Sequence, residues 1–254
     1  MKERKTIYLC LAHMSETGEE QKYVKEAFDT NWVVPLGPNV NGFEDDLKAF
    51  VSKNSDGSEL SREVVALSAG TAAVHLGLLA SGVGPGDEVC VQSFTFCASS
   101  HPITYLGATP VFIDSEPDSW NMDPELLEKA IIDRKEKTGK YPKAIVPVAL
   151  YGMPYDCDKI MAISEKYGIP VVEDAAEGCG SRWKGQVLGT FGKFGVLSFN
   201  GNKMITTSGG GALICQDAES KNNVMWYATQ ARDAYPYYPV SYTHLRAHET
   251  REDL

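Results

Sequence analysis

Lys203 is a candidate for covalent chemistry, but its local sequence does not decide whether it has this role. It lies in "SFNGNKMITTSGGGALI" (198–214), between a short apolar run and a Ser-Gly-Gly-Gly stretch. A lysine becomes a nucleophile only when its amine is partly neutral, as burial and nearby cations can make it. Most lysines are solvated, so the local pattern leaves two interpretations open: a surface cation, or an amine that bonds to a cofactor.

A possible anion site lies in "SAGTAAVHLG" (68–77), which follows an apolar run and opens a helical pattern. We predict that Gly70 lets the backbone turn sharply there. Thr71 and Ala72 would then present amide N–H groups, and Thr71 its hydroxyl, at the positive end of a helix, where a phosphate binds well. A capped helix without a ligand explains the same residues. No GxGxxG follows a predicted strand, which argues against a dinucleotide cofactor.

Two carboxylates, Glu173 and Asp174, end the apolar run "IPVVED". Side chains alternate along a strand, so the two should face opposite ways, with Asp174 at the ligand edge. A carboxylate there can keep a ring nitrogen protonated; a helix-capping Asp is the alternative. Phe94 and Phe96, in "SFTFCASS", follow another run and could either stack on a flat ring or pack in the core.

The elements that would position these residues alternate along the chain. We predict strands at 63–68, 87–92, 109–114, 143–150, 169–174, 194–199 and 211–216, and helices at 19–30, 42–51, 71–81, 95–105, 124–137 and 156–167. This alternation predicts an α/β fold: a mostly parallel sheet with helices on both faces. Ligands of such sheets bind at the carboxyl ends of the strands. The four groups of residues would meet there, and together they fit a phosphate-bearing pyridine aldehyde, pyridoxal 5'-phosphate.

The composition narrows the class of protein. The 254 residues carry a net charge of −10, which argues against a nucleic-acid partner. We read no signal peptide and no membrane span. The six cysteines are scattered and form no CxxC pair, so we predict neither disulfides nor a zinc site, and a cytoplasmic location. His244 and His248 have helical metal-pair spacing but no third ligand, so we predict no metal.

With these motifs in order, the chain resembles the DegT/DnrJ/EryC1/StrS family of pyridoxal-phosphate-dependent sugar-nucleotide aminotransferases. The matching stretches run from about residue 7 to about residue 238. They include "NWVVPLGPNVNGFED", "GPGDEVCVQSFTFCAS", "GATPVFIDSEPDSWNMDP", "VALYGMP" and "VVEDAAEGCGS". The resemblance implies an aspartate-aminotransferase-like large domain (fold type I), with a mostly parallel mixed sheet sandwiched by helices.

The resemblance also implies residue roles. Lys203 would be the Schiff-base lysine and would move the proton during transamination, and Asp174 would pair with the pyridine nitrogen. Glu177 stands where many relatives have Gln or His near the ring hydroxyl, so its carboxylate would need a proton or another partner. The full implied cofactor site is Gly70, Thr71, Ala72, Phe96, Asp174, Glu177, Ser198 and Lys203, with the phosphate near Thr71, Ala72 and Ser198 and the ring against Phe96.

The implied reaction is transamination of a nucleotide-linked keto sugar, a UDP-4-keto sugar, with glutamate as amino donor, for surface polysaccharide or glycan biosynthesis. The implied assembly is a homodimer. Lys203 argues against the relatives that dehydrate sugars, which carry His at that position. Two alternatives stay open: another pyridoxal-phosphate reaction such as an amino-acid lyase, and a fragment with little or no activity.

We expect three parts along the chain: an N-terminal helix and arm (1–35), the cofactor-binding large domain (36–238) and an atypical tail (239–254). The family pattern stops after "WYATQARDAYPYYP", and "VSYTHLRAHETREDL" (240–254) matches nothing expected of the family. We therefore expect a truncated chain that lacks most of a smaller C-terminal domain.

Overall fold

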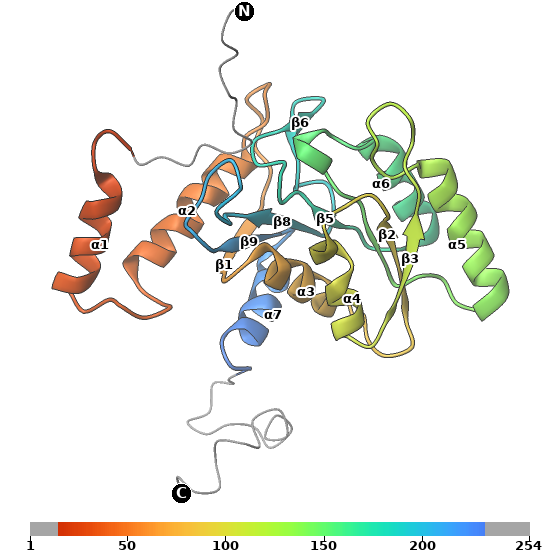
Figure 1. The fold of residues 1–254 in the computed structure, drawn as a ribbon, viewed down its shortest axis with the longest axis horizontal. Helices are drawn as coiled ribbons and strands as arrows, with labels where there is room; N and C mark the ends of the chain where they lie inside the picture. Colours follow the sequence, from red (N-terminus) through yellow and green to blue (C-terminus); the bar gives the residue numbers. More distant parts are fainter. Residues whose placement is uncertain (1–14, 232–254) are drawn as a thin grey trace, which may run out of the picture.

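A computed structural model of the protein describes residues 15–231 (Figure 1). Its main sheet has a four-stranded part of order β1-β9-β8-β5 and a three-stranded part of order β3-β2-β4. Isolated parallel bridges, Ile145 to Val171 and Val148 to Asp174, join the two parts between β4 and β5. The strands are β1 (Glu63–Leu67), β2 (Glu88–Gln92), β3 (Thr109–Ile113), β4 (Ala144–Val146), β5 (Val172–Asp174), β8 (Phe194–Ser198) and β9 (Gly211–Cys215).

Strand directions confirm the predicted mixed, mostly parallel sheet. β2 runs parallel to both β3 and β4, and β5 runs parallel to β8. β9 is the antiparallel member, since it pairs antiparallel with both β1 and β8. A separate two-stranded hairpin of β6 (Arg182–Trp183) and β7 (Gln186–Val187), which the sequence pattern did not predict, lies between β5 and β8 in the chain.

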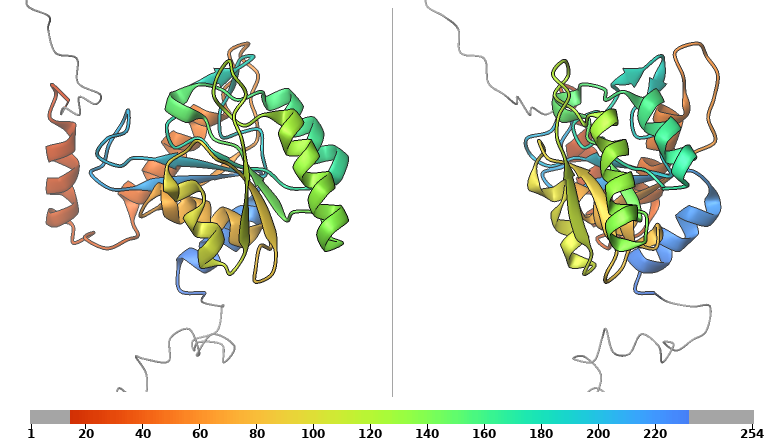
Figure 2. Two further views of the ribbon diagram at one scale, coloured as in Figure 1. Left: turned by 45° about the vertical axis from the view of Figure 1, so that its right-hand side comes forward. Right: turned by 90° about the vertical axis from the view of Figure 1, so that its right-hand side faces the viewer.

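Helices cover both faces of the sheet, as Figure 2 shows in two turned views. On one face lie α3 (Gly70–Ala80), α4 (His101–Tyr105) and α7 (Ala218–Ala228), which bury Leu78, Ile103 and Val224 in one core cluster. On the other lie α2 (Pro38–Ser52), α5 (Pro124–Thr138) and α6 (Cys157–Tyr167), whose apolar residues form the second cluster. Two buried faces explain why the central strands are apolar along their whole length.

The first helix, α1 (Glu19–Asp29), forms as predicted but buries none of its residues. Its apolar side chains Tyr23, Val24 and Phe28 are 53%, 59% and 69% exposed. Figure 1 shows α1 at one end of the molecule, away from the sheet. The division of the chain at residue 35 remains a prediction. The tail 239–254, with His244 and His248, lies outside the described residues.

Four predicted elements differ in extent by several residues, each time near a proline. The strand expected at 169–174 begins only at Val172, after Pro170. The helix expected at 95–105 is split into the 3-10 turn η1 (Cys97–Ser99) and α4, whose second residue is Pro102. The strand expected at 143–150 ends before Pro147, which has no N–H to donate to a neighbour, and the chain continues into the 3-10 turn η2 (Leu150–Gly152). Helix α2 begins at Pro38, four residues earlier than predicted, because proline is well suited to the first helical position.

No helix within residues 15–231 is long and apolar enough to cross a membrane.

Candidate active site

A cavity of about 690 Å³ opens where β1, β5 and β8 end and where the loop after β2 passes. It brings together seven of the eight residues that the sequence placed around one cofactor: Gly70, Thr71, Phe96, Asp174, Glu177, Ser198 and Lys203. Ala72, the eighth of them, does not line the cavity. The carboxyl edge of the sheet therefore gathers these residues as expected.

The predicted reason for Gly70 is wrong, although the residue is in the cavity wall. Gly70 does not have a left-handed backbone, so the turn from β1 into α3 does not itself require a glycine at this position. A Cβ at this position would instead lie 2.9 Å from Cβ of Ser198. Glycine is therefore needed because the start of α3 packs directly against the end of β8. Gly211 serves the same contact, since its Cβ would lie 2.3 Å from the carbonyl carbon of Ala69.

This packing brings the N-terminus of α3 to the cavity. The N–H of Ala73 donates to the carbonyl of Ala69 at 3.1 Å and so begins the helical ladder. The amides of Gly70, Thr71 and Ala72 precede that bond and belong to the turn whose N–H groups have no intrahelical acceptor. With the hydroxyl of Ser198 beside them, they form the type of edge on which an anion binds.

Asp174 is 6% exposed and lines the cavity. Its Oδ2 accepts a hydrogen bond from the Ser99 hydroxyl at 2.6 Å, and its Oδ1 accepts one from the N–H of Ala176 at 3.1 Å. Burial raises the pKa of the Asp174 carboxyl, while these two bonds and the charge of Lys203 act in the opposite direction. Asp174 is thus a buried carboxylate held by two donors, with a cation in the same cavity.

Ser99 is a residue of the site that the sequence reasoning missed. It is fully buried, and its hydroxyl also lies 2.8 Å from that of Thr95. The two hydroxyl residues are four apart in "SFTFCASS", a spacing that could have drawn attention to them. Only the fold shows that the second one faces Asp174.

Glu173 faces the other way, as the alternation along the strand predicted. Its carboxylate is fully buried and accepts from three backbone N–H groups, those of Gly189, Phe191 and Gly192, at 2.9, 2.6 and 2.5 Å. Burial raises the pKa of the Glu173 carboxyl, and the bonds from these amides oppose that rise. Glu173 therefore anchors the turn that leads into β8, on the side of the strand away from the cavity.

Lys203 and Glu177 are ion-paired, with Nζ of Lys203 3.1 Å from Oε1 of Glu177. Their side chains are 13% and 28% exposed. The second oxygen of Glu177 accepts from the N–H of Tyr151 at 2.7 Å. Tyr151 has a left-handed backbone (φ 51°), which aims that N–H at the carboxylate. The carboxylate that was expected to need a proton or another partner therefore has two partners, and one of them is the lysine.

Both aromatic residues of the loop after β2 lie on the surface. Phe96 is 72% exposed and lines the cavity. Phe94 is 48% exposed, lines the same cavity and lies 5.8 Å from Trp120, ring centre to ring centre. The alternative that they are packed core aromatics is wrong for both, and Phe96 is free to meet a ring placed in the cavity.

The chemistry of the residues around this cavity fits pyridoxal phosphate. A lysine amine, a buried carboxylate held by Ser99, and a helix start pressed against Ser198 by Gly70 surround one cavity. Within residues 15–231, no group of three His, Cys, Asp or Glu side chains could hold a metal ion.

The mixed α/β fold, with this cavity at the carboxyl edge of its sheet, is the fold of the pyridoxal-phosphate-dependent fold type I class. Comparison with models of known protein families identifies the family within this class. The chain belongs to the DegT/DnrJ/EryC1/StrS aminotransferase family, whose model matches residues 14–241. Aminotransferases of this family use pyridoxal phosphate.

Two similar curated relatives are longer than this chain. It is 48% identical over 237 residues to the EpsN protein of Bacillus subtilis and 40% identical over 200 residues to the GDP-perosamine synthase of Caulobacter vibrioides. The matches cover 93% and 79% of this chain, but 58% and 50% of the relatives. The chain thus spans about half the length of the curated relatives it matches.

Solved structures agree in fold. A DegT/DnrJ/EryC1/StrS aminotransferase from Brucella abortus matches with a TM-score of 0.75 and 32% identity, over 89% of this chain and 61% of that one. The PLP form of Spr1654 from Streptococcus pneumoniae matches with a TM-score of 0.71 and 28% identity, over 87% and 58%.

Proposed function

We propose that this chain carries the cofactor-binding part of an aminotransferase that converts a nucleotide-linked keto sugar into an amino sugar, with glutamate as donor. The observation that carries the proposal is Lys203 paired with Glu177 in the cavity that also contains the buried Asp174. Family membership and the likeness to a GDP-perosamine synthase support the sugar-nucleotide class of substrate.

Pyridoxal phosphate, when bound, supplies an aldehyde that bonds to amines and a pyridine ring that draws electrons from them. We assign its phosphate to the amides at the start of α3 and the hydroxyl of Ser198, and its ring face to Phe96. Asp174 would hold the ring nitrogen protonated. Its burial supports this assignment, because a carboxylate in a dry site interacts strongly with a charge beside it.

Lys203 is the residue that we propose to bond to the cofactor and to move the proton. Its side chain is only 13% exposed, so bulk water competes weakly for that proton. Glu177 would hold the amine in place while it is free, because the Tyr151 N–H fixes the orientation of the Glu177 carboxylate.

A homodimer is part of the proposal. Among the described residues that line the cavity, the charged side chains are Asp174, Glu177 and Lys203, two negative and one positive. A phosphate dianion needs more positive charge than this, and a second copy of the chain could supply it at the cavity mouth. We also propose the cytoplasm as location, which fits the free thiols of Cys90, Cys97, Cys157, Cys179 and Cys215.

We also propose which nucleotide carries the sugar and which pathway uses the product. The family resemblance led us to expect UDP as the nucleotide. The relative from Caulobacter vibrioides, however, is named a GDP-perosamine synthase. We keep a 4-keto sugar on UDP as the first substrate to test, with its GDP counterpart beside it, and surface polysaccharide or glycan biosynthesis as the setting.

The test begins with the cofactor. The protein is incubated with pyridoxal phosphate, reduced with borohydride and digested. It should then carry a pyridoxyl group, the label, on Lys203, and the Lys203→Ala variant should carry none. Glutamate added to the loaded protein should then yield 2-oxoglutarate. A label on Lys203 without 2-oxoglutarate would favour the lyase or the inactive fragment, and a label elsewhere would overturn the assignment of Lys203.

A further inference from the structure

Glu177 offers one carboxylate oxygen to Lys203 and the other to the backbone. Nζ of Lys203 lies 3.1 Å from Oε1, and the N–H of Tyr151 donates to Oε2 at 2.7 Å. Among the described residues, only Lys203 donates to Oε1. When Lys203 bonds to the cofactor, its amine is no longer free to pair with Glu177. Oε1 then lacks a cation, and a shielded charge without a partner is unfavourable.

Contacts other than the one with Lys203 fix the Glu177 carboxylate. Tyr151 has a left-handed backbone (φ 51°), which is rare for a bulky residue, and its N–H is directed at Oε2. The next residue, Gly152, packs against the same segment, since a Cβ there would lie 3.0 Å from the carbonyl oxygen of Glu177. Backbone strain of this kind gathers at ligand sites. The carboxylate would therefore keep its place when the lysine amine leaves.

Glu177 is also the carboxylate of this cavity that can take another cation. Asp174, the other acidic residue in the wall, already accepts from the Ser99 hydroxyl through Oδ2 and from the N–H of Ala176 through Oδ1. Tyr151 is the remaining titratable side chain among the described residues that line the cavity, and Lys203 is their one cation. Once Lys203 has left, Oε1 of Glu177 is the free acceptor for an ammonium group.

We propose that Glu177 binds the ammonium group of the amino donor, and that Lys203 occupies this site until it bonds to the cofactor. The donor nitrogen must replace Nζ of Lys203 on the same carbon atom, so the two nitrogens need nearly the same position. Glu177 already holds one amine there at hydrogen-bond distance. The inference rests on the proposed function and deepens it, because it assigns a residue to recognition of the donor.

The exchange of the two amines balances with Glu177 as the ammonium site. The bond from the carbon atom to Nζ breaks as the bond to the donor nitrogen forms. Of the three protons on the donor ammonium, two pass to Nζ and one stays on the donor nitrogen with the positive charge. Lys203 therefore leaves as a neutral amine, the form that can take up a proton, while Glu177 keeps a cation beside it.

Lys203→Ala leaves Glu177 without its cation and gives the first test. In the cofactor-free variant, about 50 mM methylammonium should raise the melting temperature by about 2–4 °C relative to tetramethylammonium, which has no N–H to donate. The wild type should not distinguish the two salts, because Nζ fills the site. The double variant Lys203→Ala/Glu177→Gln should not distinguish them either, since it lacks the charge. No difference in Lys203→Ala, or an equal one in the double variant, would overturn the proposal.

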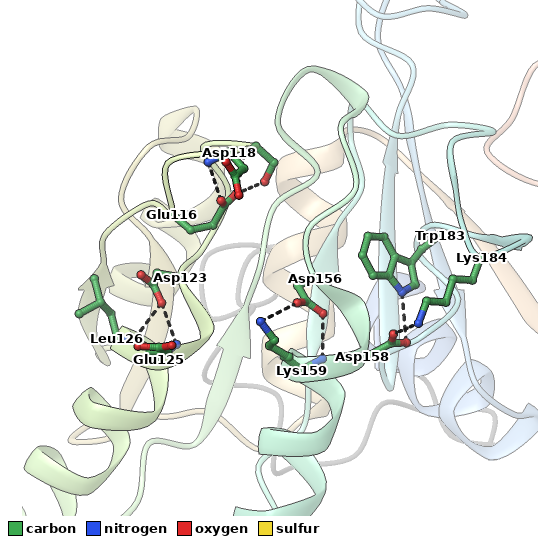
Figure 3. A network of polar contacts seen from close by, with 11 residues as sticks. Glu116, Asp118, Asp123, Glu125, Leu126, Asp156, Asp158, Lys159, Trp183 and Lys184 are labelled. Atoms are coloured by element: carbon green, nitrogen blue, oxygen red, sulfur yellow. Dashed lines mark hydrogen bonds and ion pairs between the residues drawn. The ribbon is translucent and has the colours of Figure 1, made fainter.

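A second lysine–carboxylate pair supplies the matched control. Lys184 and Asp158 are ion-paired beside α6, with side chains 70% and 52% exposed, and the ring N–H of Trp183 also donates to Asp158 (Figure 3). Lys184→Ala frees a carboxylate that water solvates, so methylammonium should stabilise this variant no more than tetramethylammonium does. Equal stabilisation of Lys184→Ala and Lys203→Ala would show a general salt effect and overturn the site.

Glutamate gives the second test, in the protein loaded with cofactor. Glu177→Gln keeps an acceptor for the Tyr151 N–H but loses the charge. The glutamate concentration for half-maximal formation of 2-oxoglutarate should therefore rise about tenfold, with a smaller change in the maximal rate. An unchanged half-maximal concentration would overturn the role of Glu177 in binding the donor.

The ammonium titrations need no cofactor. Ammonium binding at Glu177 without 2-oxoglutarate formation would count against the proposed transamination alone. Formation of 2-oxoglutarate without any ammonium effect would count against the Glu177 site alone.

Discussion

The hydroxyl of Ser99 lies 2.6 Å from Oδ2 of Asp174, across 75 positions of sequence. Both residues are buried, and Asp174 reaches the cofactor cavity while Ser99 stands behind it. This bond and the one from the Ala176 N–H fix the orientation of the carboxylate at the cavity wall, where we propose that it meets the ring nitrogen. Ser99 is therefore a positioning residue for Asp174.

Ser99→Ala should weaken the binding of pyridoxal phosphate about tenfold, because a hydrogen bond to a charged group contributes about 1.5–3 kcal/mol. The measurement is equilibrium titration of the cofactor-free protein, followed by cofactor absorbance. Ser100→Ala is the matched control, since the Ser100 hydroxyl bonds to the carbonyl of Cys97 at 3.2 Å instead. Equal affinity in both variants would show that Ser99 does not position Asp174.

Asp174→Asn should raise the melting temperature of the cofactor-free protein at neutral pH by a few degrees, while cofactor binding is lost. The physical reason is the raised pKa of the Asp174 carboxyl, caused first by burial. A carboxyl whose pKa is higher in the folded state binds protons more readily there, so the folded state gains stability as pH falls through that pKa. Above it the wild type carries a buried charge that asparagine lacks.

The gain from Asp174→Asn should therefore shrink as the pH is lowered, once the wild-type carboxyl is protonated too. Melting curves over a pH series check this. The neighbouring change Glu173→Gln is the contrasting control: a neutral amide cannot replace a carboxylate that accepts from three N–H groups, so it should destabilise the protein. A constant gain at every pH would contradict the explanation for Asp174.

Gly70→Ala should destabilise the protein by about 1–3 kcal/mol, because the new Cβ would sit 2.9 Å from Cβ of Ser198 and the two elements must move apart. The same shift should weaken cofactor binding, since it displaces the start of α3. Chemical denaturation and cofactor titration measure the two effects. Gly84→Ala is the control, because a Cβ there meets nothing within 4 Å. Equal stability of the two variants would refute the close-packing role of Gly70.

Much of the fold and part of the site follow from local patterns. The period of two along "IPVVED" was enough to predict that Glu173 and Asp174 face opposite ways, and the alternation of apolar runs with helical stretches predicted the mixed sheet with its two covered faces. Strand ends gather at one edge of such a sheet, so Lys203, Asp174, Phe96 and the start of α3 could be placed around one cavity. The predicted element boundaries were wrong at Pro38, Pro102 and Pro147. At each of these positions the conformational restrictions of proline override the pattern of the neighbouring residues.

Only the tertiary structure decided how these residues are paired. Ser99 with Asp174, and Lys203 with Glu177, are partners 75 and 26 positions apart, and no periodicity links them. The reason for Gly70 is likewise tertiary, since it is the approach of Ser198 on another element that excludes a side chain. Sequence patterns determine which face of an element is buried. Which residue of another element that face contacts depends on the order of the strands in the sheet. That order is set by the packing of the whole domain.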